Sequence, residues 1–231
     1  MMARSQPSHG KCAFCGVGVT DSNVTRHLQT CSARQSAIQK ADRDRRQQRL
    51  YHLLITAANS PLYWLHLEMN GAASLATLDH YLRAIWVECC GHLSQFSIGA
   101  SRAGNEVVMG TEADRVLSRT DRLSYVYDFG TETQLEIRVE DGREGQPLTD
   151  HPIHLMARND PPPLACGVCG EPATTLCSFC WDEGQDTWAL CDAHAEAHLE
   201  GHPDHEDSYC AVVNSPRMGL CRYNGPAEPP Y

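Results

Sequence analysis

The sequence contains no long hydrophobic run. No apolar stretch approaches the ~20 residues that a helix needs to cross a bilayer, so we expect no membrane contact. A hydrophobic N-terminal stretch of the secretory type is also lacking. We therefore expect a cytoplasmic protein whose cysteines stay reduced and bind metal ions instead of forming disulfides.

Positive charge is scarce outside the first 50 residues. Residues 1–50 carry nine Lys or Arg against three Asp, whereas the remainder carries ten against twenty-six Asp or Glu. An acidic body repels nucleic acid, so contact with a polyanion should be confined to the N-terminal end. The basic side chains there that could bind phosphates are Arg43, Arg45, Arg46 and Arg49.

Cysteine, in contrast, is abundant, with twelve in 231 residues. Paired Cys-x2-Cys units present two thiolates at the separation that a tetrahedral Zn²⁺ requires. One group with this spacing lies near the N-terminus and a longer one near the C-terminus, and together they predict three zinc ions per chain. The first comprises Cys12, Cys15, His27 and Cys31; the second comprises Cys166, Cys169, Cys177, Cys180, Cys191 and His194, followed by His198, His202, His205 and Cys210.

The first group, CAFCGVGVTDSNVTRHLQTC at residues 12–31, resembles the small Cys-Cys-His-Cys ubiquitin-binding fingers of DNA-repair ligases. His27 and Cys31 are four residues apart on an expected helix, hence on one face. Gln29 stands where those fingers carry the Asp that engages ubiquitin. Two interpretations stay open: a zinc-stapled domain that docks an unspecified partner, and ubiquitin-like recognition.

The second group resembles a B-box-like cross-brace. That resemblance implies that the first and third ligand pairs share one zinc ion and that the second pair shares another with two trailing histidines. We choose His202 and His205 for these, with His198 as the rival. Fully coordinated sites leave no position for water and are structural. The implied sets are Cys166, Cys169, Cys191, His194 and Cys177, Cys180, His202, His205.

Hydrophobic periodicity predicts an α+β fold, with one helix packed on a mainly antiparallel sheet and zinc-stabilised modules at both ends. Residues 32–59 lack Pro and Gly and are expected to be helical. Leu62 to Asn70 alternates as a half-buried strand, residues 74–86 have helical spacing, and strands are expected at 95–98, 106–109, 124–129 and 133–140. The expected domains are a finger at 1–33, a connecting helix at 34–60, the α+β domain at 61–158 and a two-zinc module at 159–231.

Residues 61–140 resemble the Ri-plasmid ORF-three-like family, which includes transposon passenger proteins. The shared segments are PLYW at 61–64, SLATL at 74–78, GHLSQF at 91–96 and YVYDFG at 125–130. Titratable residues typical of members are replaced, for example by Leu65-His66 where members carry two arginines. The resemblance therefore implies a fold more than an activity. Cys89 and Cys90 are expected to be small buried hydrophobes.

These features favour a non-enzymatic adaptor that uses zinc-stabilised modules to bind another macromolecule, a protein in the first place. Nucleic-acid binding through the finger and the Arg43–Arg49 segment is the first alternative. The second is a hydrolase associated with mobile elements that uses His92 and Asp128 for acid–base chemistry.

Overall fold

A computed structural model describes residues 7–42, 47–99 and 104–231. The chain divides into two compact units. The first comprises residues 1–82, 93–160 and 229–231, and the second comprises residues 83–92 and 161–228.

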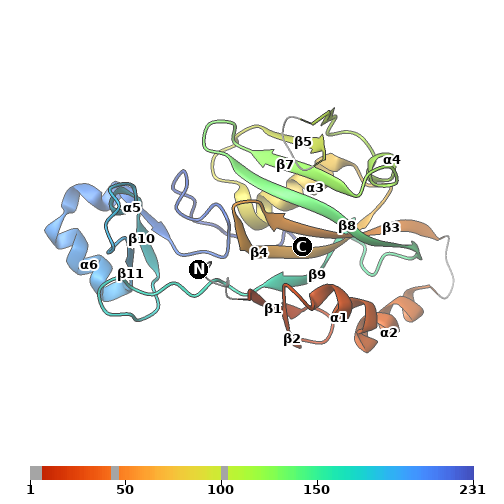
Figure 1. The fold of residues 1–231 in the computed structure, drawn as a ribbon, viewed down its shortest axis with the longest axis horizontal. Coiled ribbons are helices and arrows are strands. Elements are labelled where there is room, and N and C mark those ends of the chain that lie inside the picture. The colour runs from red at the N-terminus through yellow and green to blue at the C-terminus, as the bar shows by residue number, and fades with distance from the viewer. Residues whose placement is uncertain (1–6, 43–46, 100–103) are drawn as a thin grey trace, which may run out of the picture. The chain divides into compact units, whose positions relative to one another are not determined.

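The first unit is built on a nine-stranded sheet (Figure 1) in the order β2-β1-β9-β4-β3-β8-β7-β5-β6. Every neighbouring pair in it is antiparallel, which confirms the predicted fold class. The strands are β1 His9–Cys12, β2 Gly18–Thr20, β3 Gln48–Ala57, β4 Ser60–Asn70, β5 Ser94–Ile98, β6 Glu106–Val107, β7 Arg122–Tyr127, β8 Thr133–Gly145 and β9 Ile153–Asn159.

Four α-helices accompany this sheet: α1 Val24–Thr30, α2 Ser32–Ala41, α3 Leu75–Leu82 and α4 Ala113–Leu117. The helix predicted at residues 74–86 is α3, followed by a π-helical turn, η1, at Arg83–Val87. Asp79 of α3 accepts hydrogen bonds from Ser94 of β5 and Tyr125 of β7. These two bonds fix α3 against one half of the sheet.

The predicted helix at residues 32–59 is wrong in its second half. Of its described residues, Ser32–Ala41 are helical and Gln48–Ala57 form β3, which pairs with β4 on one side and β8 on the other. Residues 43–46 lie outside the described part of the chain. Both faces of β3 are largely buried, so its apolar residues do not alternate. A central strand of this kind has no period of two to distinguish it from a helix.

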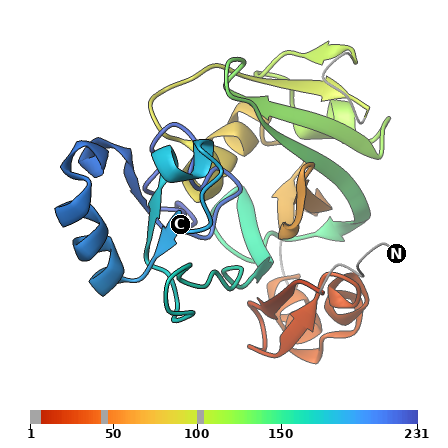
Figure 2. The same ribbon diagram turned by 60° about the vertical axis from the view of Figure 1, so that its left-hand side comes forward.

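The strand at 60–70 exists, but both of its faces are buried, not one. The second layer on this part of the sheet is the N-terminal finger (Figure 2), whose apolar residues pack against Trp64 of β4 and Met156 of β9. Strand β1 extends the sheet by pairing with β9, with Cys12 opposite Ala157. The finger is thus an integral part of the first unit, whereas the sequence predicts a separate module joined through a helix.

The second unit contains a three-stranded antiparallel sheet in the order β11-β10-β12. Short helices accompany it, and its apolar residues form two small clusters. One consists of Ala173, Leu176, Ala189 and Cys210, and the other of Cys166, Leu190 and Ala195. Its elements after η1 are β10 Thr175–Cys177, α5 Ser178–Asp182, β11 Ala189–Leu190, α6 Asp192–Gly201, the 3-10 helix η2 Pro203–Ser208 and β12 Tyr209–Ala211.

Candidate metal centres and a buried polar network

The predicted N-terminal ligands lie together. Cys12 ends β1, Cys15 follows in a turn, His27 lies in α1 and Cys31 separates α1 from α2. Their sulfur and ring nitrogen atoms are all within 4.8 Å of one another, and Cys15 Sγ is 3.4 Å from His27 Nε2. Donor atoms around a tetrahedral Zn²⁺ are about 3.4–3.8 Å apart, so the four residues fit this ion.

The turn between Cys12 and Cys15 accounts for this geometry. Gly16 adopts a φ of 70°, which glycine tolerates, and its N–H donates to the Cys12 carbonyl at 2.9 Å. Burial raises the pKa of Cys12 to about 11, while the backbone N–H of Val17 lowers the pKa of Cys15. Such a pair of thiols favours a bound cation. The cation would offset the desolvation of the buried Cys12 thiolate, and the backbone N–H already stabilises the Cys15 thiolate.

A second group has the same turn. Cys166, Cys169, Cys191 and His194 place their donor atoms within 4.8 Å of one another, with Cys169 and Cys191 sulfurs 3.8 Å apart. The N–H of Gly170 donates to the Cys166 carbonyl at 2.9 Å, as Gly16 does in the first group. Burial alone would raise the pKa of Cys166, but backbone N–H groups, first that of Cys191, lower it to about 6.

The third group differs from the predicted set in one ligand. Cys177, Cys180, His198 and His205 lie together, with Cys180 Sγ 3.5 Å from His198 Nε2 and Cys177 Sγ 3.6 Å from His205 Nδ1. His202 directly follows α6, and its ring stacks on that of His205 instead. His198 replaces it because α6 continues from His194 to Gly201, which turns residue 198 inward one helical turn after residue 194.

A fourth group was not predicted. Cys89, Cys90, His92 and Cys221 also place their donor atoms within 4.8 Å of one another. The expectation that Cys89 and Cys90 are buried hydrophobes is wrong, because Cys89 is half-buried and Cys90 is exposed. The Cys-Cys-x-His spacing was the available signal, but its distant partner, Cys221, is not evident from the sequence.

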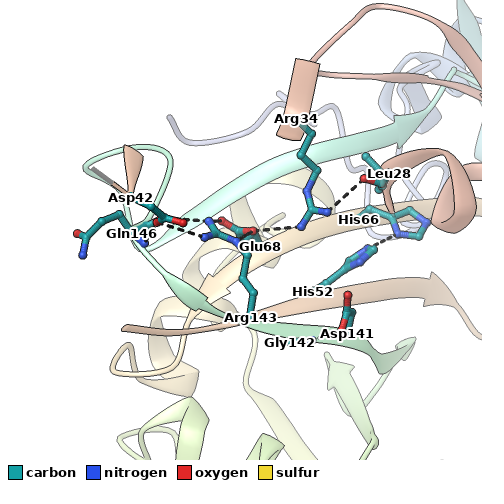
Figure 3. A network of polar contacts seen from close by, with 10 residues as sticks. All are labelled: Leu28, Arg34, Asp42, His52, His66, Glu68, Asp141, Gly142, Arg143 and Gln146. Carbon is teal, nitrogen blue, oxygen red and sulfur yellow. Dashed lines mark hydrogen bonds and ion pairs between the residues drawn. The ribbon is translucent and has the colours of Figure 1, made fainter. Parts of the chain in front are cut away.

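A buried polar network lies within the first unit (Figure 3). The Glu68 carboxylate of β4 accepts two hydrogen bonds from Arg143 of β8, from Nε at 2.9 Å and from the terminal nitrogen at 2.7 Å. Arg34 of α2 approaches the same carboxylate at 3.4 Å and donates to the Leu28 carbonyl at 3.2 Å. Glu68 thus links the finger helices to two strands of the sheet.

Beside this network, His52 Nε2 of β3 lies 2.8 Å from His66 Nδ1 of β4. Burial lowers the pKa of each histidine to about 3. At neutral pH both rings are therefore uncharged, and neither is poised to accept a proton.

The two residues of the hydrolase hypothesis, His92 and Asp128, make other contacts in the structure. His92 belongs to the fourth thiol group, and Asp128 lies in a turn with a φ of 64°, where its carboxylate accepts the Gly130 N–H at 2.9 Å. Among the described residues, Asp128 belongs to no group of candidate metal ligands. Of the basic side chains proposed for nucleic acid, residues 43–46 lie outside the described residues, and Arg49 pairs with Glu144 at 3.5 Å.

In the described parts of the chain, no helix is both long and apolar enough to span a membrane. Residues 49–179, more than half of the chain, match the family described as plasmid pRiA4b ORF-3-like protein. The chain belongs to this family. The matched range includes nearly all of β3, which the resemblance at 61–140 did not cover, and it extends through Cys166, Cys169 and Cys177 of the C-terminal groups.

No curated protein matches the chain. Among solved structures, the chain is similar to a protein of unknown function, MM3350, from Methanosarcina mazei Go1. The two are 19% identical, the TM-score is 0.39, and the match covers 46% of this chain and 66% of that one.

Proposed function

We propose that this protein is a non-enzymatic, cytoplasmic adaptor whose C-terminal zinc-stabilised module binds a basic segment of a protein partner. In this proposal the N-terminal group and the two C-terminal groups each hold a structural Zn²⁺, with no ligand position left for water. Small units with few apolar residues depend on metal binding for their folding free energy, and the second unit has small apolar clusters.

The observation that carries the proposal is the surface of this module. Residues 161–210 contain ten Asp or Glu, all exposed, and no Lys or Arg. Phe179 and Trp181, on either side of the candidate ligand Cys180, are 46% and 47% exposed. Exposed aromatic side chains surrounded by one sign of charge are typical of a protein-binding surface, and the acidic charge favours a basic partner.

This surface also favours the adaptor over its alternatives. An acidic module repels phosphates, so it does not favour nucleic acid. The donor sets are complete without water, which does not favour hydrolysis. The finger's role in this proposal is to extend and cover the sheet, because its helices pack on β4 and β9.

The test is selection of peptides from a randomised library with the zinc-loaded full chain. Enriched peptides should carry an excess of Lys and Arg with apolar positions between them, and their affinity should fall with salt. Replacing both Phe179 and Trp181 by Ala should weaken binding without loss of zinc. Val108→Ala is the control, because it removes an apolar side chain of the first unit that is 74% exposed and lies outside the module.

Two outcomes would refute the proposal. One is enrichment of peptides without positive charge, or of peptides that bind the double variant as well as the unchanged protein. The other is tight, salt-sensitive binding of labelled duplex or single-stranded DNA, which would favour the nucleic-acid hypothesis.

A further inference from the structure

We infer that Cys89, Cys90, His92 and Cys221 form a fourth, structural Zn²⁺ site that joins the turn after η1 to the segment before the C-terminus. All four residues belong to the second unit. The inference does not depend on the adaptor role, because it concerns how this unit is held together.

The distances between donor atoms fit one tetrahedral ion. Cys90 Sγ lies 3.7 Å from Cys89 Sγ, 3.7 Å from Cys221 Sγ and 3.0 Å from His92 Nε2. Cys221 Sγ lies 3.5 Å from the same nitrogen. Bonded sulfurs would be ~2.05 Å apart, whereas sulfurs sharing a Zn²⁺ are about 3.8 Å apart. Three thiolates and one imidazole are a common donor set for structural zinc.

Neighbouring side chains fix the turn that carries three of the ligands. The Glu88 carboxylate accepts hydrogen bonds from Arg83 at 2.6 Å and from the Gly91 N–H at 2.6 Å. Arg83 also donates to the His92 carbonyl at 2.7 Å. Gly91 has a φ of 79°, which lets the chain reverse between Cys90 and His92.

The segment before the C-terminus is anchored to the same place. Ser215 donates to the Trp86 carbonyl and accepts the Arg217 N–H at 2.8 Å. Cys221 is held at a φ of 48°, a left-handed conformation that a non-glycine residue adopts only when its surroundings impose it. These bonds hold Cys221 beside the other three ligands.

The local charge is also that of a metal–thiolate site. Arg217 is fully buried, and one of its terminal nitrogens lies 3.4 Å from Cys89 Sγ. A buried guanidinium beside a sulfur favours the thiolate. Three thiolates around a Zn²⁺ leave one net negative charge, which Arg217 balances. Such outer contacts orient and tune the ligands of zinc sites.

An ion bound at this site would cross-link two segments that are far apart in the sequence. Cys90 and Cys221 are 131 positions apart, so an ion bound by both restricts the unfolded chain strongly. Each thiol that binds releases its proton, and no oxidant is needed. The site is closed and therefore structural.

The experiment measures zinc and thiol reactivity in the full chain. Elemental analysis should find close to four zinc ions per chain, and Cys221→Ala should lower this number by one. Cys210→Ala is the matched control, because Cys210 is buried and is the one cysteine outside the four groups. It should leave the number unchanged.

Alkylation of the unaltered protein provides a test that does not require a variant to fold. Cys90 and Cys221 are exposed, yet iodoacetamide should modify them slowly until a chelator removes the metal. Rapid modification of both in a protein with three zinc ions would overturn the inference. A mass 2 Da lower without reductant, mapped to a disulfide among Cys89, Cys90 and Cys221, would overturn it as well.

Discussion

The buried Glu68 carboxylate is the most direct test of how the finger is attached to the sheet. Its side chain is 3% exposed, and its partners Arg143 and Arg34 are 16% and 10% exposed. Glu68→Gln removes the negative charge but keeps the shape. Two guanidinium groups then lie close together in a buried site without the carboxylate they share, and the remaining carboxylate is Asp42, 4.0 Å from Arg143.

The loss of folding free energy expected for Glu68→Gln follows from this geometry. Removing one partner of a buried ion pair costs about 3–5 kcal/mol, because the remaining charge is desolvated without compensation. For a chain of this size, 1 kcal/mol corresponds to roughly 2–4 °C in the melting temperature, so Glu68→Gln should melt about 10 °C lower. Arg143→Met should cost more than Arg34→Met, since Arg143 makes two short hydrogen bonds and Arg34 a single contact at 3.4 Å.

The assay is urea unfolding of the zinc-loaded chain followed by tryptophan fluorescence. Glu144→Gln is the matched control, because its ion pair with Arg49 is about half exposed on both sides and should contribute less than about 1 kcal/mol. A triple replacement of Glu68 by Leu and of both arginines by Met should recover most of the lost stability. A loss below about 1 kcal/mol for Glu68→Gln would refute this account of the attachment.

Three further predictions concern pH, metal ligands and strand packing. Because His52 and His66 have a pKa of about 3 in the folded chain against 6.5 ordinarily, the unfolded chain binds more protons between these values. Stability should therefore be full above about pH 6.5 and fall below it, by roughly 1.4 kcal/mol per histidine at pH 5.5, in urea unfolding with excess zinc; a double Gln variant that keeps the same pH slope would contradict this. His198→Ala should release one zinc ion per chain and His202→Ala none, as measured by elemental analysis; the reverse result would favour the ligand choice made from sequence. Gly10→Ala should destabilise by about 1–3 kcal/mol in the same unfolding assay, because the new Cβ would clash with the backbone carbonyl of Arg158 and with the Trp64 ring, 2.6 Å away; an unchanged unfolding midpoint would show that β1 can move away from β9.

The sequence predicted which candidate ligands lie together where their spacing along the chain is short. Cys12 and Cys15, or Cys166 and Cys169, are near neighbours whatever the fold, and the chain indeed gathers them with the partners that pattern suggested. The choice between His198 and His202 depended on how far α6 continues after His194, which local sequence does not specify. The metals themselves remain predictions.

Strand β3 shows where hydrophobic periodicity fails. It was expected to be helical because residues 32–59 lack Pro and Gly, and its apolar residues do not alternate because both of its faces are largely buried. Strands β1, β2 and β9 were also missed. The pairing of β1 with β9 joins residues more than 140 positions apart, such as Cys12 and Ala157, and such non-local contacts have no local signature. Strands β1 and β2 pair locally, but each is only three or four residues long.

The sequence by itself determined the α+β class, the acidic body, and the short-range thiol pairs, because composition, periodicity and spacing along the chain are local properties. Only the tertiary structure decided that the finger is part of the sheet, that Glu68 pairs with two arginines, and that Cys221 lies beside Cys90. These three depend on residues brought together from distant parts of the chain, and the packing that unites them cannot be inferred from any segment alone.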